Sequence, residues 1–161
     1  MMTAISFDVY GIPQPQGSHK AVMAGGFARV VPTGGGAFAA WRNAVTEAAY
    51  RAATALDAPL GGPLRLTVIF RYPMPPSGIR KAHRAAGWRW KTTTPDCDKL
   101  VRAVGDALSA AGLVADDKLI VDVHACKIEV LDGWHGASIT VEPLTADTTI
   151  ASVATRQAAL L

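Results

Sequence analysis

The sequence predicts a single α+β domain, in which a mixed or largely antiparallel sheet packs against two helices. Apolar residues make up half of the 161 residues, which is enough to bury a core. Short stretches of strand-like alternation are separated by two longer stretches whose apolar residues recur at helical intervals. We see no internal repeat, so we expect one domain over residues 1–144.

The first part of the chain predicts a strand, a hairpin and a helix. Residues 4–10 alternate apolar and polar side chains, and a Pro- and Gly-rich turn ends this strand. Residues 21–23 and 27–31 flank Ala24-Gly25-Gly26, which predicts a β-hairpin. Residues 37–55 then place apolar side chains on one helical face, so we expect an amphipathic helix there.

The second part predicts another strand, a helix and two closing strands. Residues 64–71 alternate as a strand, whereas residues 72–94 lack periodicity and are expected to form one long loop. An apolar stripe over residues 100–111 predicts a second helix, closed by a left-handed glycine. Residues 119–130 and 137–141 follow as two strands joined by a turn.

Residues 145–161 have no core-forming pattern until their last residues, and we expect them to be a poorly ordered tail. No apolar run approaches the roughly 20 residues that a membrane-spanning helix needs, and the N-terminus lacks the pattern of a secretion signal. We therefore expect a soluble, cytoplasmic protein. Its two cysteines are too few for a disulfide scaffold and lack zinc-site spacing, so both are expected to be free thiols.

Charge is unevenly distributed along the chain, although the net charge is only +3. Between Asp57 and Asp96 there is no acid, but there are seven Lys or Arg residues, with Trp88 and Trp90 among them. Eight of the thirteen acids then lie between Asp96 and Asp132. A group of acids beside a basic segment suits a polyanion that is both bound and cut.

The acids crowd around the second predicted helix. Asp96 and Asp98 lie near its start, and Asp116 and Asp117 follow its end. One acid would satisfy the free N–H groups of a helix N-terminus, an interaction of about 0.3–1 kcal/mol. Further acids add a repulsion that folding gives no reason to accept and that a divalent cation would relieve. We therefore favour a metal site over helix capping alone.

The acids belong to a longer ordered string that is continuous over residues 95–117. The string reads Pro-Asp-x-Asp-x-Leu, then an Arg, then Asp-Ala-Leu-x-x-Ala-Gly and Asp-Asp. In this order and at these intervals it resembles the signature of the RusA-type Holliday junction resolvases, small magnesium-dependent endonucleases of phage and prophage origin. The resemblance implies a RusA-like fold and Mg²⁺ as the cofactor, with Mn²⁺ able to replace it.

The resemblance also implies roles for individual residues. Asp96, Asp98 and Asp117 match the metal-binding acids of the family, and Arg102 stands where the family carries a catalytic Lys or Arg. Asp116 stays open as an alternative ligand, because adjacent acids point in different directions. Arg102 falls one helical turn after Asp98, which suits either a partner for the reacting phosphate or an ordinary ion pair within the helix.

Basic residues are the candidates for DNA binding, with a solvated surface as the alternative. The tryptophans among them could stack on unpaired bases or wedge into a branch point. We assign to DNA the basic residues of the predicted loop, together with Lys127, where the family tends to carry a Lys, and one residue of the hairpin: Arg80, Lys81, Arg84, Arg89, Lys91, Lys127 and Lys20.

We expect a partner of branched DNA, resolved by paired nicks during recombination and repair. Symmetric nicking of a four-way junction requires two active sites related by a two-fold axis, hence a homodimer. Residues 98–111 would span about 20 Å as a helix at about 1.5 Å per residue, and the next residues can hardly reach back to Asp98. Asp117 of one subunit is therefore expected to complete the metal site of the other. The alternative is that the helix is short or broken at Gly105 and that the site closes within one subunit.

Two other functions stay open at this stage. One is a branched-DNA-binding protein whose acids hold a structural cation. The other is an Asp-x-Asp nucleotidyl- or glycosyltransferase, which would need a Gly-rich phosphate-binding turn. Against the transferase, Gly34-Gly35-Gly36 does not clearly follow a strand and open a helix.

Overall fold

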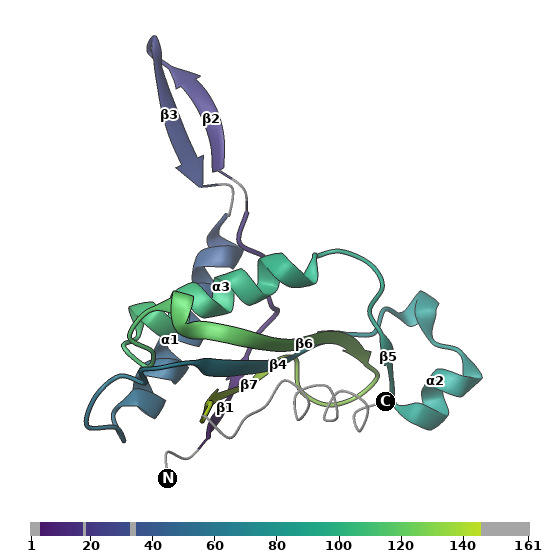
Figure 1. Ribbon diagram of the computed structural model, residues 1–161. Helices are drawn as coiled ribbons and strands as arrows, with labels where there is room; N and C mark the ends of the chain where they lie inside the picture. The colour runs from purple at the N-terminus through teal and green to yellow at the C-terminus, as the bar shows by residue number, and fades with distance from the viewer. Residues whose placement is uncertain (1–3, 18, 33–34, 146–161) are drawn as a thin grey trace.

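The structure, a computed structural model, describes residues 4–17, 19–32 and 35–145, and within residues 19–24 and 27–32 it describes the backbone alone. Five strands form one sheet in the order β1-β7-β4-β6-β5. A separate two-stranded hairpin projects away from this sheet (Figure 1). The hairpin pairs β2 (His19–Ala24) with β3 (Phe27–Pro32) around Gly25 and Gly26, as predicted.

The sheet is mixed, and β4 is its central strand. β4 pairs parallel with β6 on one side and antiparallel with β7 on the other. β1 pairs antiparallel with β7, and β5 pairs antiparallel with β6. The prediction of an α+β fold with a mixed sheet is confirmed. The sheet strands are β1 (Ile5–Tyr10), β4 (Leu64–Pro73), β5 (Trp88–Trp90), β6 (Ile120–Val130) and β7 (Gly136–Pro143).

Two long helices, α1 (Gly36–Ala53) and α3 (Cys97–Ala110), pack on one face of the sheet (Figure 1). Every second residue of β4 from Leu64 to Phe70 is fully buried and faces them. Each such side chain stabilises the fold by about 1.5–3 kcal/mol through removal of apolar surface from water. The helices contribute their predicted apolar stripes to the same core: Trp41, Val45, Ala49, Leu100, Val104 and Leu108.

The prediction of one long loop over residues 72–94 is wrong in part, because this segment contains three short elements. A 3-10 turn η1 (Pro76–Gly78), a helix α2 (Lys81–Ala86) and strand β5 follow one another. None of the residues of α2 is buried, so it carries no apolar stripe that periodicity could reveal. The domain thus has three α-helices within the described residues instead of the predicted two.

The last two strands of the sheet are not neighbours. β6 and β7 follow one another in sequence, but β4 lies between them in the sheet, so they do not form a hairpin. The predicted tail lies almost wholly outside the described residues, since residues 146–161 are not among them. None of the described helices is long and apolar enough to cross a membrane.

Candidate metal and DNA-binding site

Asp96 and Asp98 lie at the start of α3 with exposed side chains. Asp96 is the N-cap residue of α3, but its carboxylate makes no capping hydrogen bond. Instead Oδ2 of Asp96 lies 2.9 Å from Nζ of Lys99, and the hydrogen bond from this ammonium lowers the pKa of Asp96. Asp98 has no ion pair within the described residues. A capping hydrogen bond therefore does not account for Asp96, whereas Asp98 lies in the first turn of α3, where the helix dipole favours an acid.

Asp116 and Asp117 differ in their surroundings. Oδ1 of Asp116 accepts a hydrogen bond from the backbone N–H of Lys118 at 3.0 Å, and its Oδ2 lies 2.8 Å from Nζ of the same residue. The side-chain hydrogen bond with Lys118 lowers the pKa of Asp116. Asp117 begins the 3-10 turn η2 (Asp117–Leu119) and is exposed. Asp117 takes part in no ion pair within the described residues, whereas Asp116 is paired with Lys118.

Asp117 lies beside Gly105, in the middle of α3. A Cβ atom built on Gly105 would lie 4.0 Å from Cβ of Asp117. Gly105 is seven residues after Asp98, which is about 10 Å along a helix axis at about 1.5 Å per residue. α3 runs without a break through Gly105, so the helix keeps Asp98 and Asp117 apart.

One chain does not bring the three predicted ligands together. Among residues 4–17, 19–32 and 35–145 there is no group of three or more His, Cys, Asp or Glu side chains that could hold one metal ion. Asp96 and Asp98 stand at one end of α3, and Asp117 stands beside its middle. The metal assignment of these acids therefore stays a prediction.

Arg102 lies between these two groups of acids. Its side chain is exposed and lines a groove of about 180 Å³ together with Asp106 and Asp117. No ion pair within the described residues involves Arg102, so the ordinary intrahelical pair is not found. A guanidinium that is not neutralised by its own helix is available to a phosphate.

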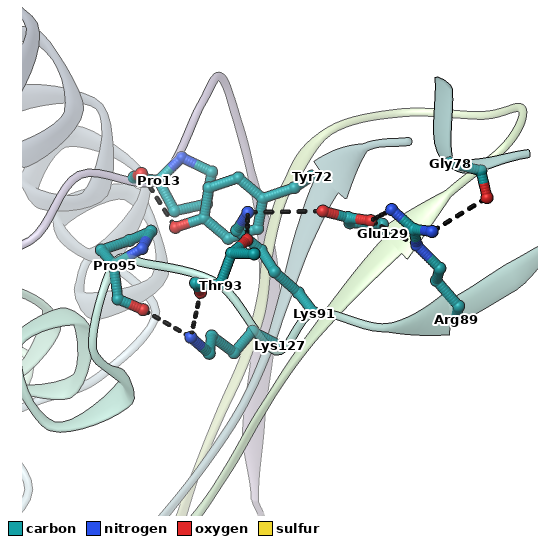
Figure 2. A network of polar contacts seen from close by, with 9 residues as sticks. All are labelled: Pro13, Tyr72, Gly78, Arg89, Lys91, Thr93, Pro95, Lys127 and Glu129. Carbon is teal, nitrogen blue, oxygen red and sulfur yellow. Dashed lines mark hydrogen bonds and ion pairs between the residues drawn. The ribbon is translucent and has the colours of Figure 1, made fainter. Parts of the chain in front are cut away.

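Lys127 has a structural role that the sequence did not reveal. Its Nζ atom donates hydrogen bonds to the carbonyl oxygens of Thr93 and Pro95, each at 2.6 Å (Figure 2). These two residues belong to the segment that leads from β5 into Asp96. Lys127 therefore links the segment that precedes α3 to strand β6.

Arg89 and Lys91 also make structural contacts, through the buried carboxylate of Glu129 (Figure 2). Nε of Arg89 donates to Oε2 of Glu129 at 2.6 Å, and its Nη1 donates to the carbonyl oxygen of Gly78 at 2.9 Å. Nζ of Lys91 lies 3.4 Å from Oε1 of Glu129 and 4.9 Å from the centre of the Tyr72 ring. These contacts hold β5 and its neighbouring segments in place, so DNA binding is no longer needed to explain either residue.

The remaining predicted DNA-binding residues of this region are exposed. Arg80, Lys81 and Arg84 lie in or next to α2, and no ion pair within the described part of the chain involves them. Trp88 and Trp90 are 40% and 59% exposed and meet edge to face, with ring centres 5.0 Å apart. Lys20 lies in β2, and its side chain is outside the description. Cations and aromatic rings together form a surface of the kind that binds unpaired nucleic acid.

Comparison with known proteins gives one family. The family model described as Endodeoxyribonuclease RusA matches residues 11–142, which include the β-hairpin, α3 and all the candidate acids of the ordered string. No curated protein matches the sequence significantly.

Proposed function

Since the chain belongs to the RusA endodeoxyribonuclease family, we propose that it is a magnesium-dependent endonuclease that resolves Holliday junctions by paired nicks in recombination and repair. The observation that carries this proposal is the availability of Asp98 and Arg102 on one face of α3. Both side chains are exposed, and neither takes part in an ion pair within the described residues. Phosphodiester cleavage needs such oxygen ligands for a metal beside a positive charge.

We assign the ligands of Mg²⁺ to Asp96, Asp98 and Asp117, with Mn²⁺ able to replace it. When bound, the cation supplies an activated water and offsets charge on the phosphate. Hard cations prefer carboxylate oxygens, which fits this donor set. Arg102 would hold a non-bridging oxygen of the phosphate through its N–H groups. Arg80, Lys81 and Arg84 would hold flanking phosphates of the DNA.

A homodimer would complete the metal site, and strand β6 offers a surface for it. β5 pairs with β6 only over residues 128–130, so within the described residues the outer edge of β6 before residue 127 is unpaired. Val121 and Val123 are 62% and 45% exposed on this strand. An unpaired edge with exposed apolar side chains is a template for pairing with another chain.

Antiparallel pairing of two β6 edges about a two-fold axis near Val123 would have a definite consequence. The Ile120 end of one strand would lie opposite the Lys127 end of the other. Lys127 contacts Pro95, and Asp117 directly precedes the first residues of β6. Asp117 of each subunit would therefore approach Asp96 and Asp98 of its partner.

The transferase alternative has to be corrected on one point. Of the glycines that were expected not to link a strand to a helix, Gly35 is the N-cap residue of α1 and Gly36 is its first residue, and β3 ends shortly before them at Pro32. β3 belongs to the projecting hairpin and not to the main sheet, so this turn does not lie at the end of a core strand as phosphate-binding turns do. The family match favours the endonuclease.

Incubation of a synthetic four-way junction, and of a linear duplex, with Mg²⁺, Mn²⁺ or EDTA tests the proposal. We expect paired nicks near the branch of the junction with either metal, and none in the duplex or in EDTA. Asp98→Asn should abolish nicking and retain junction binding, whereas the matched change Asp57→Asn, at an exposed acid outside the ordered string, should cut like the wild type. Junction binding without nicking would indicate the architectural protein, and transfer from a nucleotide donor would indicate the transferase.

A further inference from the structure

A groove of about 470 Å³ opens beside Asp96. It lies between the Pro-rich turn that follows β1 and the segment that precedes α3. Its walls are largely apolar and include Ile12, Pro13, Tyr72 and Pro95. Ile12 is 43% exposed although it is apolar, so one wall of the groove faces solvent uncovered.

Hydrogen bonds from three elements hold this groove in shape. The hydroxyl of Tyr72, in β4, donates to the carbonyl oxygen of Pro13 at 3.0 Å. The N–H of Gln16 donates to the carbonyl oxygen of Lys99 in α3 at 3.1 Å. On the other wall Lys127 of β6 holds Pro95, as Figure 2 shows. A site that is already ordered before the ligand binds loses little binding free energy to the ordering of its side chains and loops.

The groove is also lined by a few polar side chains. Gln14 offers an amide, which can both donate and accept hydrogen bonds. Lys99 brings an ammonium group that is paired with the carboxylate of Asp96, whereas the ammonium group of Lys91 is already held by Thr93 and Glu129. Apolar walls, one amide and the ammonium group of Lys99 match the flat base, the polar base edge and the phosphate of a nucleotide.

We propose that this groove holds one unpaired nucleotide of the branched DNA, next to the bond that is cut. The inference rests on the proposed function, because it takes Asp96 as part of the cutting site. A base in a continuous duplex has both faces covered by its neighbours and cannot enter the groove without unstacking. Unstacking costs least where pairing is already interrupted, as at a branch point. The groove would therefore favour junctions over linear duplexes.

A double-mutant cycle between the groove and the DNA tests this. The protein variant combines Ile12→Ala with Gln14→Ala, and Tyr50→Ala, at an exposed ring on α1, is the matched control. The DNA partner is a series of four-way junctions, each with one abasic site at a different position near the branch. Binding is measured by fluorescence anisotropy in EDTA, so that no strand is cut.

At one position the abasic site should weaken binding to the wild type and to Tyr50→Ala by about tenfold, the size expected for loss of one stacked base. The same abasic site should weaken binding to the groove variant less than twofold, because that variant no longer binds the base that the abasic site removes. Equal penalties for the wild type and the groove variant at every position, or no penalty anywhere, would overturn the inference and leave the endonuclease proposal intact. If the double variant unfolds, Gln14→Ala alone takes its place. A wild type that binds junction and duplex equally would overturn the proposed function as well.

Discussion

The Nζ atom of Lys127 lies 2.6 Å from the carbonyl oxygen of Pro95, so strand β6 holds the peptide that leads into Asp96. The same ammonium group also bonds to the carbonyl oxygen of Thr93. The start of α3, where Asp96 and Asp98 lie, is thus held by the sheet and not by a capping side chain.

Replacing Lys127 by Met should lower the nicking rate at saturating DNA by about ten- to hundredfold, because misplaced ligands lose the geometry of the reaction. Junction affinity should change less than twofold. Nicking and anisotropy assays measure the two effects. Arg51→Met, which removes an exposed cation paired with Glu47 in α1, is the control and should leave both unchanged. A loss of affinity with a flatter salt dependence and an unchanged rate would instead make Lys127 a DNA contact.

Glu129→Ala should destabilise the protein by about 2–3 kcal/mol, because Arg89 and Lys91 would lose the carboxylate that compensates their burial. Arg89 is partly exposed, which keeps the effect below that of a fully buried pair. Denaturant unfolding measures the change. Glu47→Ala, at an exposed ion pair, should stay within about 0.5 kcal/mol of the wild type. Similar stabilities for both variants would contradict this account of Glu129.

The combined change of Arg80, Lys81 and Arg84 to Ala should weaken junction binding and make it less sensitive to salt. Each lost phosphate contact lowers the slope of log affinity against log salt by about 0.9. The fold should be unaffected, since these side chains are exposed and form no ion pair within the described residues. An unchanged salt slope would show that these three residues do not contact DNA and that α2 is an ordinary solvated surface.

The pKa of Asp96 should respond to Lys99. The hydrogen bond from Lys99 lowers this pKa, so the pair is present above the usual Asp pKa and is lost as the pH falls through the lowered value. Lys99→Gln should therefore raise the pKa of Asp96 towards its ordinary range. Carboxyl ¹³C NMR titration without metal measures the shift. A pKa of Asp96 that is the same in both proteins would show that Lys99 does not hold it.

The sequence was sufficient for the elements that build the core. β4, α1 and α3 bury regular faces, so their apolar side chains recur with the period of the element. α2 buries nothing and β5 has only three residues, so neither leaves a periodic pattern. The periodicity of apolar residues cannot reveal elements that are held in the fold by a few polar contacts.

The chemistry of the candidate site was predictable, but its supports were not. The spacing of Asp96, Asp98 and Arg102 is local, so the order of residues reveals it. Lys127 and Pro95 are 32 residues apart, and Arg89 and Glu129 are 40 residues apart. Only the pairing of β6 with β4 and β5 brings these partners together, so the sequence did not reveal that Lys127, Arg89 and Lys91 make structural contacts.

A mixing experiment tests the central claim, that two chains build each cutting site. Asp98→Asn and Asp117→Asn should each be inactive alone. In the heterodimer, one site would combine the intact Asp96 and Asp98 of one subunit with the intact Asp117 of the other, so mixing should restore nicking of one strand of a four-way junction. If each site lay within one chain, neither would be intact, and complete inactivity despite proven subunit exchange would contradict the account.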